Sequence, residues 1–146
     1  MATTQFSCEI SNSDPAVPLV LKIYIDGANV LTLAPVPAEY YFESTFEDSE
    51  LTQTHTIEFE LLGKSPEHTV VDDQGNIVKD AVITIRNKKL ETILIDAAFD
   101  QRTQYWHDFN GSSEKIRDEF FGVMGCNGQT RFEFTTPIYV WMLENL

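Results

Sequence analysis

The stretch "HTIEFELLGKSPEHTVVDDQGNIVKDAVITIRNKKLETILID", residues 55–96, decides the fold class. Between residues 56 and 61, apolar side chains alternate with polar ones, which is the period-two pattern of a strand with one buried face. Gly63 and Pro66 end this strand, because glycine weakens a strand interior and proline cannot donate a hydrogen bond to a sheet. The stretch therefore begins as a half-buried β-strand.

An acidic segment follows at Asp72, Asp73, Gly75 and Asn76. Asp and Asn side chains bond the local backbone, and Gly and Asn tolerate positive φ, so these residues favour a turn. An EF-hand loop needs acidic or amide residues at alternate positions, then a glycine and a later glutamate, and "DDQGN" lacks that spacing. The segment is predicted to turn the chain rather than to bind calcium.

Two apolar runs complete the stretch. The segments "DAVITIRN" (80–87) and "KLETILID" (89–96) are predicted to be consecutive strands. Their expected core residues are Ile83, Ile85, Leu90, Ile93 and Ile95.

Further strand patterns lie on both sides of this stretch. Residues 20–33 form a predicted hairpin that turns at Asp26-Gly27, a strong hairpin signal. Residues 39–46 are rich in aromatic side chains, as strands often are. Near the end, residues 131–136 and 138–146 are predicted strands on either side of Pro137. In the last of these, Tyr139 and Trp141 would share one face.

One segment favours a helix. Residues 112–122, "SSEKIRDEFFG", offer a capping serine, Ile116 and Phe120 on one face, and a terminal glycine. About ten short strands without βαβ alternation favour packed antiparallel sheets. The sequence thus predicts one all-β domain over residues 1–146, a two-sheet antiparallel β-sandwich of jelly-roll type with at most one short helix.

Charge and composition exclude some partners. The chain of 146 residues carries a formal net charge of −13, so its field repels nucleic acid and anionic membranes. No apolar run reaches transmembrane length, and the N-terminus lacks the pattern of a signal peptide. We expect a soluble protein that binds neither nucleic acid nor membrane. Whether Cys8 and Cys126 pair stays open.

Catalytic motifs are missing from the sequence. It contains no G-x-S-x-G elbow, no H-E-x-x-H pair and no glycine-rich phosphate loop. The three histidines, His55, His68 and His107, are spread along the chain. We therefore expect a protein that is not an enzyme.

The segment "FDQRTQYWHDFN", residues 99–110, combines aromatic and acidic side chains. Sugar rings stack on aromatic faces such as Tyr105 and Trp106, while carboxylates and amides bond their hydroxyls. The oxygen donors Asp100 and Asp108 suit Ca²⁺. The alternative is that one of the two neighbouring aromatics belongs to the core, since strand neighbours face opposite ways.

Two parts of the sequence together are similar to a known group of proteins: residues 55–96 and "PIYVWMLENL" at residues 137–146. This pattern resembles small jelly-roll proteins of marine tailed phages and marine metagenomes, which are similar to calcium-dependent xylan-binding carbohydrate-binding modules. In those modules an Asp-Arg-Asn-Leu run precedes the calcium loop. Here the run reads Ile85-Arg86-Asn87, and two lysines precede Leu90.

The resemblance implies roles for four residues. Asp100 and Asp108 would be carboxylate ligands of Ca²⁺, Trp106 would contribute its carbonyl, and Tyr105 a stacking face. It implies a non-catalytic, calcium-assisted glycan-binding module in a phage-related protein. The alternative is a structural or assembly protein of a virion, whose partners are other virion proteins and which has no small ligand.

Overall fold

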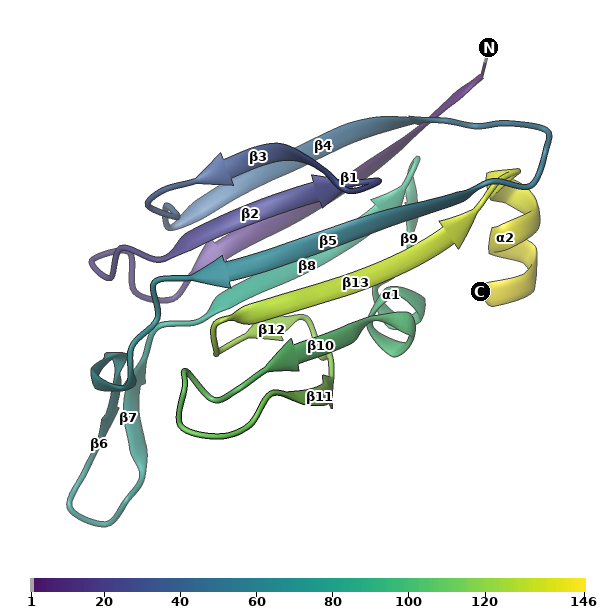
Figure 1. Ribbon diagram of the computed structural model, residues 1–146. Coiled ribbons are helices and arrows are strands. Elements are labelled where there is room, and N and C mark those ends of the chain that lie inside the picture. Colours follow the sequence, from purple (N-terminus) through teal and green to yellow (C-terminus); the bar gives the residue numbers. More distant parts are fainter. Residues whose placement is uncertain (1) are drawn as a thin grey trace.

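The computed structural model describes residues 2–146 and consists of two packed antiparallel sheets (Figure 1). One sheet has the order β12 (Val123–Met124), β8 (Ile83–Leu90), β1 (Thr3–Asn12) and β4 (Glu39–Glu47), with β9 (Ile93–Leu94) also pairing with β8. The other has the order β11 (Ile116–Glu119), β10 (Gln104–His107), β13 (Gly128–Thr135), β5 (Thr54–Leu62), β2 (Val20–Ile25) and β3 (Ala28–Leu33). The predicted β-sandwich is confirmed.

The remaining elements are short. A separate hairpin consists of β6 (Thr69–Val71) and β7 (Ile77–Asp80), and the 3-10 helix η1 (Pro66–His68) precedes it. Two α-helices, α1 (Asp96–Arg102) and α2 (Ile138–Asn145), lie near one end of the sheets (Figure 1). The sequence predicts at most one short helix, so the structure adds a second without changing the class.

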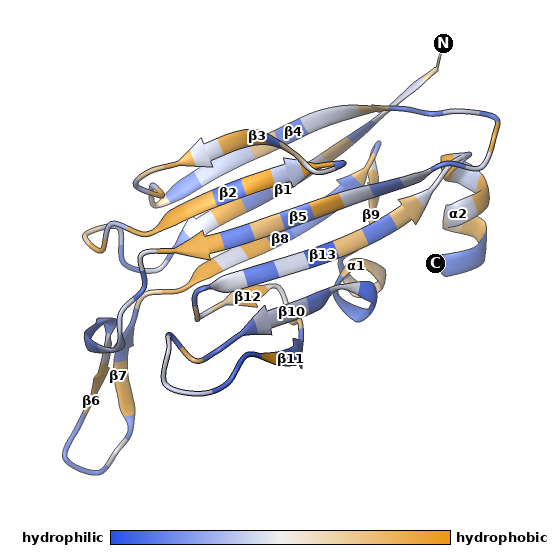
Figure 2. Ribbon diagram, viewed as in Figure 1, coloured by the Kyte–Doolittle hydropathy of each residue, from blue (hydrophilic) through white to orange (hydrophobic). Residues whose placement is uncertain are grey.

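Alternating side chains form the core between the sheets. Between residues 56 and 61 of β5 and between residues 21 and 25 of β2, the aliphatic residues and Phe59 are buried, and the residues between them lie on the outer side, so colours alternate along these strands in Figure 2. The Asp26-Gly27 turn joins β2 to β3 with positive φ at both residues, 50° and 82°, as a two-residue hairpin requires. The predicted strand at residues 56–61 and the predicted hairpin at 20–33 are both confirmed.

Aromatic rings fill much of the core. Phe99, from α1, stacks on Phe132 of β13 with ring centroids 4.2 Å apart and on Phe6 of β1 at 5.9 Å. Since Phe99 contacts both sheets and is fully buried, it fixes α1 against the end of the sandwich. This placement sets where the residues after α1 can lie.

The predicted helix at residues 112–122 is wrong. Residues Ile116–Glu119 are β11, an edge strand paired with β10. The serines that were expected to cap a helix belong to a turn instead, where Ser112 Oγ donates to the carbonyl of Phe109. A helix this short is marginal in water, whereas pairing with β10 satisfies the same backbone groups.

The predicted strand at residues 138–146 is also wrong, because this segment is α2. Trp141 is buried at 5% exposure and packs edge-on against Phe132, whereas Tyr139 is 62% exposed. Ile138 and Trp141, three residues apart, form the buried side, which is helical spacing. The sequence pattern cannot distinguish this helix from a strand, because nearly the whole segment is apolar and shows no alternation.

The run at residues 89–96 is only partly a strand. β9 contains Ile93 and Leu94, both exposed, and α1 begins at Asp96. Ile83, Ile85, Leu90 and Ile95 are buried as predicted, while the core prediction for Ile93 is wrong.

The acidic segment is the turn of the β6–β7 hairpin, as predicted. Asp72 Oδ1 accepts the N–H groups of Gln74 and Asn76, each at 2.9 Å. These hydrogen bonds, with that of Asn76 the strongest, lower the pKa of Asp72. The acid shapes the turn of an arm that projects from the sandwich (Figure 1).

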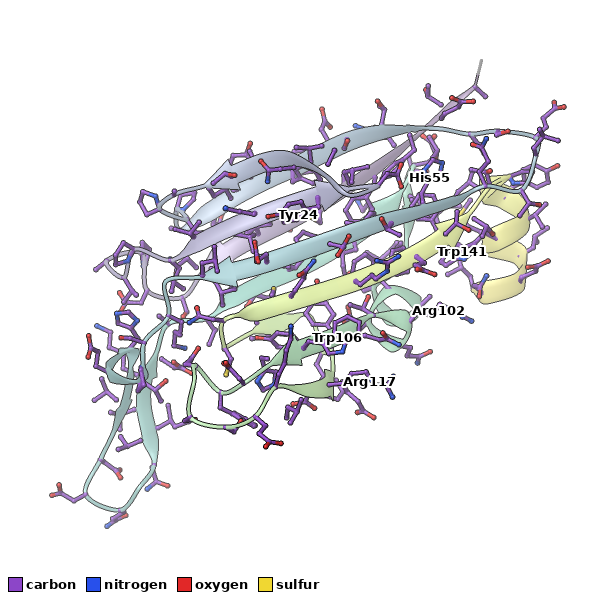
Figure 3. The ribbon with its side chains drawn as sticks, viewed as in Figure 1. Tyr24, His55, Arg102, Trp106, Arg117 and Trp141 are labelled. Carbon is purple, nitrogen blue, oxygen red and sulfur yellow. The ribbon has the colours of Figure 1, made fainter. Side chains whose placement is uncertain are left out.

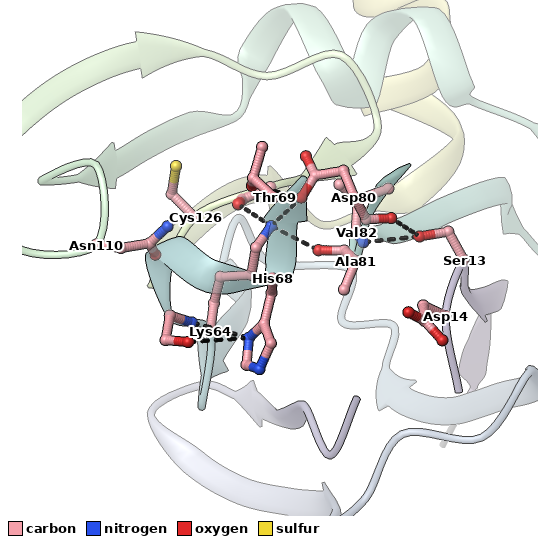
Figure 4. A network of polar contacts seen from close by, with 12 residues as sticks. Ser13, Asp14, Lys64, His68, Thr69, Asp80, Ala81, Val82, Asn110 and Cys126 are labelled. Carbon is pink, nitrogen blue, oxygen red and sulfur yellow. Dashed lines mark hydrogen bonds and ion pairs between the residues drawn. The ribbon is translucent and has the colours of Figure 1, made fainter. Parts of the chain in front are cut away.

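Lys64 holds the base of this arm. Its buried Nζ donates to Asp80 Oδ1 at 2.7 Å, to the carbonyl of Ala81 at 2.6 Å and to that of Gly125 at 2.8 Å (Figure 4). Thr69 Oγ1 donates to the same Asp80 oxygen at 2.7 Å. One satisfied ammonium thus joins the hairpin to the sandwich.

Candidate functional site

The residues singled out by sequence lie on and around β10, near one edge of the six-stranded sheet. Along this strand, Tyr105 and His107 point inward and are buried, while Gln104 and Trp106 lie on the outer face. This alternation separates the two predicted sugar-binding aromatics. They cannot stack on the same ligand.

Tyr105 is a core residue. It is 5% exposed, and its hydroxyl donates to the carbonyl of Cys126 and accepts the Cys126 N–H at 3.0 Å. Burial raises the pKa of Tyr105. Because the ring is buried, it offers no face to a sugar, and the prediction of Tyr105 as a stacking residue is corrected. The alternative prediction, that one of the two neighbouring aromatics belongs to the core, describes Tyr105.

Trp106 lies half-buried at a shallow cavity of about 220 Å³ on the outer side of the sheet. Polar residues of other segments line the same cavity. These cavity residues include Glu60, Asp108, Lys115, Asn127 and Gln129. We call this the Trp106 cleft.

The sheet register explains why these residues meet. Trp106 is paired with Arg117 of β11 on one side and with Gln129 of β13 on the other, and Gln129 is paired with Glu60 of β5. Figure 3 shows Trp106 and Arg117 near one another at the edge of the sheet. Side chains directly opposite in a sheet lie on the same face, so the row combines an aromatic ring, a guanidinium, an amide and a carboxylate.

Hydrogen bonds across the strands fix this row. Gln129 Nε2 donates to Glu58 Oε2 at 2.5 Å, and the Tyr24 hydroxyl donates to Glu60 Oε1 at 2.9 Å. The bond to Glu60 raises the pKa of Tyr24. The face is therefore ordered before any ligand arrives, which lowers the entropic cost of binding.

The turn after β10 forms one wall of the cleft. Asp108 Oδ1 accepts the N–H of Gly111 at 2.8 Å, and Asn110 Oδ1 accepts the N–H of Asn127 at 2.8 Å. Asp108 thus lines the Trp106 cleft from a turn that its own carboxylate stabilises.

Gly128 allows β13 to approach β10 closely beside the cleft. A Cβ built at this position would overlap the carbonyl oxygen of Trp106 and lie 2.9 Å from Cβ of His107. Only glycine fits there without displacement of β10. The position of the indole therefore depends on a residue without a side chain.

Asp100 lies at a different cavity. It is on α1 and lines a hollow of about 400 Å³ together with Ala97, Gln101, Thr103, Glu119, Phe120 and Phe121. Its Oδ1 is 3.0 Å from Nζ of Lys88, and burial raises its pKa. Asp100 does not share a site with Trp106 and Asp108.

The predicted calcium ligands therefore do not fit a common ion. Asp100 precedes β10 and Asp108 follows it, and a strand of four residues is about 13 Å long. Calcium needs several oxygens at about 2.3–2.6 Å. Within residues 2–146, no three His, Cys, Asp or Glu side chains are grouped to hold a metal ion.

Sequence reasoning missed several residues of the cleft. Glu60 and Gln129 occupy outward positions of strands β5 and β13, and alternation of the sequence predicts such positions. Their position beside Trp106 depends on which strands pair, and that pairing joins residues far apart in the chain.

Two solved structures are similar to this chain in fold. One is vCBM60 in complex with galactobiose, with a TM-score of 0.45 and 10% identity over 88% of this chain and 96% of that one. The other is the selenomethionine form of vCBM60. For that structure, circular permutation is described as an evolutionary link between two families of calcium-dependent carbohydrate binding modules. Its TM-score is 0.46, with 11% identity over 88% of this chain and 89% of that one.

In sequence, no protein-family model and no curated protein matches the chain. Within residues 2–146, no helix is both long enough and apolar enough to cross a membrane.

Proposed function

We propose that this chain is a non-catalytic carbohydrate-binding module and that the Trp106 cleft binds a glycan. The observation that supports this is the half-buried indole of Trp106, which lies at a cavity on the sheet face among amide and carboxylate side chains. An indole face packs against the C–H groups of a sugar, and the surrounding polar groups bond its hydroxyls. This combination suits a neutral sugar better than an ionic ligand.

Charge favours a neutral glycan as well. The cleft contains both acidic and basic side chains, such as Asp108 and Lys115, while the whole chain carries −13. A strongly anionic polysaccharide would be repelled by this field.

The outer sheet face extends beyond the cleft. Tyr24 of β2 lies half-buried on the outer face, three strands away from Trp106 across β13 and β5. Neighbouring strands are about 4.8 Å apart, so the two aromatics are separated by roughly 14 Å across the sheet. An oligosaccharide would reach both residues, whereas a single sugar would contact only one.

Calcium has no assigned role in this proposal. Asp100 and Asp108 would be its carboxylate ligands by resemblance, but the length of β10 separates them. Binding is therefore proposed to depend on the side chains of the cleft alone.

A structural role in a phage-related particle is the second candidate. Exposed apolar side chains favour it, since Leu143 on α2 is 82% exposed and Ile77 on the β6–β7 arm is 64% exposed. On α2, Tyr139, Val140 and Leu143 are exposed together, and contiguous exposed apolar patches often mark contacts with other proteins. This role predicts a defined complex with another virion protein, which a charged substitution such as Leu143→Asp would weaken.

The test of the glycan proposal is binding of the purified protein to a glycan array, followed by titration calorimetry on the best ligand. Trp106→Ala should abolish measurable binding, because it removes the stacking surface. Tyr139→Ala is the matched control, since it removes an exposed aromatic on α2, away from the cleft. No binding to any glycan, with or without calcium, or equal binding by Trp106→Ala would overturn the proposal.

A further inference from the structure

Two lysines are buried in this protein, and their surroundings differ. The Lys64 ammonium donates three well-directed hydrogen bonds, all at 2.8 Å or less. An ammonium has three protons to donate, so Lys64 is satisfied as an ion. It provides an internal reference for the second lysine.

Lys88 is less well satisfied. It is 1% exposed, and its Nζ donates one well-directed hydrogen bond, to the carbonyl of Ile85 at 2.6 Å. Two carboxylate oxygens are also close, Asp100 Oδ1 at 3.0 Å and Asp96 Oδ1 at 3.2 Å. Yet Asp100 Oδ1 is buried and receives no hydrogen bond of acceptable geometry within the described residues. The amine and the carboxyl group thus lie within ion-pair distance, but without a hydrogen bond of regular geometry between them.

The amine end of this contact is shielded from water. Lys88 is 1% exposed, and the rings of Phe99 and Phe120 lie 5.3 Å and 5.8 Å from Nζ. Burial raises the pKa of Asp100, which favours its neutral acid form.

Asp96 differs from Asp100 in its contacts. Its Oδ1 accepts the backbone N–H of Lys88 at 2.9 Å, which fixes it beside the amine. It is therefore placed to receive and release a proton, while Asp100 is placed to react.

We propose that Lys88 and Asp100 are joined by an intramolecular amide bond, formed with Asp96 as the proton carrier. Nζ of Lys88 attacks Cγ of the protonated Asp100 carboxyl group. The C–N bond forms and the C–OH bond breaks. Asp96 takes the proton that the nitrogen loses and delivers it to the departing hydroxyl, so one water molecule leaves and Asp96 is regenerated. No other reactant is consumed.

The bond would attach α1 covalently to β8. Lys88 is the sixth residue of β8 and Asp100 lies in the last part of α1. The link would close the chain between them and replace the Lys88–Asp100 contact with a neutral amide. It would also fix the wall of the 400 Å³ cavity that Asp100 lines.

The first test is the mass of the intact, denatured wild-type protein. We expect a mass lower than that of the sequence by one water molecule, and peptide fragmentation should assign the loss to Lys88 and Asp100. A mass equal to that of the sequence overturns the proposal, and this measurement needs no variant to fold.

Variants separate the amide from other dehydrations, such as a succinimide at an aspartate. Lys88→Arg and Asp100→Ala should restore the full mass, and Asp96→Ala should restore it in most molecules. Lys64→Arg is the matched control and should retain the loss, because Lys64 takes no part in the reaction. Retention of the loss in Lys88→Arg would overturn the proposal. Glycan binding is measured in a separate experiment, so failure of the amide proposal can be told apart from failure of the glycan proposal.

Discussion

Trp106 and Gln129 are paired across β10 and β13 and face the same side of the six-stranded sheet. The pairing places an amide beside the indole, and the amide is held by its hydrogen bond to Glu58. A ring and an oriented amide in one cavity are the groups by which proteins recognise sugars.

Gln129→Ala should weaken glycan binding roughly threefold to tenfold, which corresponds to the loss of one hydrogen bond. Titration calorimetry measures the change in Kd. Gln104→Ala is the control, because Gln104 lies on the same face of β10 but does not line the Trp106 cleft. If both variants lose glycan affinity equally, the loss comes from a general change of the outer sheet face and not from the removal of Gln129.

Tyr24→Ala should affect long ligands more than short ones. Because Tyr24 is three strands away from Trp106, it would contact only an oligosaccharide that crosses the sheet. Comparison of Kd for a disaccharide and a longer oligosaccharide of the same sugar checks this. If Tyr24→Ala weakens both ligands equally, the ligand does not cross the sheet.

Gly128→Ala should destabilise the protein by about 1–3 kcal/mol, the usual cost of forcing an extra group into a packed region. The new Cβ would overlap the Trp106 carbonyl, so glycan binding should fall together with stability. Urea unfolding measures the first effect and calorimetry the second. Gly111→Ala is a useful comparison, since a Cβ there meets no atom within 4 Å although its φ of +88° still strains the backbone.

Asp72 should make the protein less stable in acid. The pKa of Asp72 is lowered by the N–H of Asn76 and other turn hydrogen bonds, so its contribution to stability is present above the ordinary carboxyl pKa of about 4 and is lost as pH falls through the lower folded value. Asp72→Asn should remove this part of the acid dependence, whereas Asp73→Asn should not. Thermal unfolding between neutral and strongly acidic pH measures both, and identical acid profiles for Asp72→Asn and the wild type would contradict the assignment.

Calcium should not stabilise the protein specifically. The predicted ligands Asp100 and Asp108 lie before and after β10, so they cannot share one ion. The Tm after chelation should therefore respond equally to calcium and magnesium. A specific rise of several degrees with calcium would show a site that this pair of carboxylates does not explain.

The sheets could be predicted from sequence where one face of a strand is buried. In β2 and β5 the alternation of apolar and polar residues matches the alternation of burial. In α2 the segment is apolar on nearly every side, so period cannot distinguish a strand from a helix. In β11 every residue is exposed, and its structure follows from pairing with β10 rather than from its own pattern.

The site was predictable only in part. The sequence indicated Trp106 and Asp108, which line the cleft, but grouped them with Tyr105 and Asp100, which do not. Tyr105 and Trp106 are neighbours in a strand, so they face opposite sides of the sheet, and Tyr105 is the one that faces inward. Asp100 lies apart from the cleft because residues 96–102 form helix α1. Glu60 and Gln129 reach the cleft through strand pairing, which no local pattern encodes.

The β6–β7 arm has a consequence for how this protein can vary. None of residues 65–80 is buried, and Lys64 and Ala81 already join the sandwich at the base of the arm. Thr69 and Asp80 belong to the hydrogen-bond network of the buried Lys64. The part of the arm between them can therefore change in length or sequence, or be exchanged for another insert, with little effect on the folding of the sheets. Its surface is free to diverge, so related chains would differ most in what this arm touches and least in how they fold.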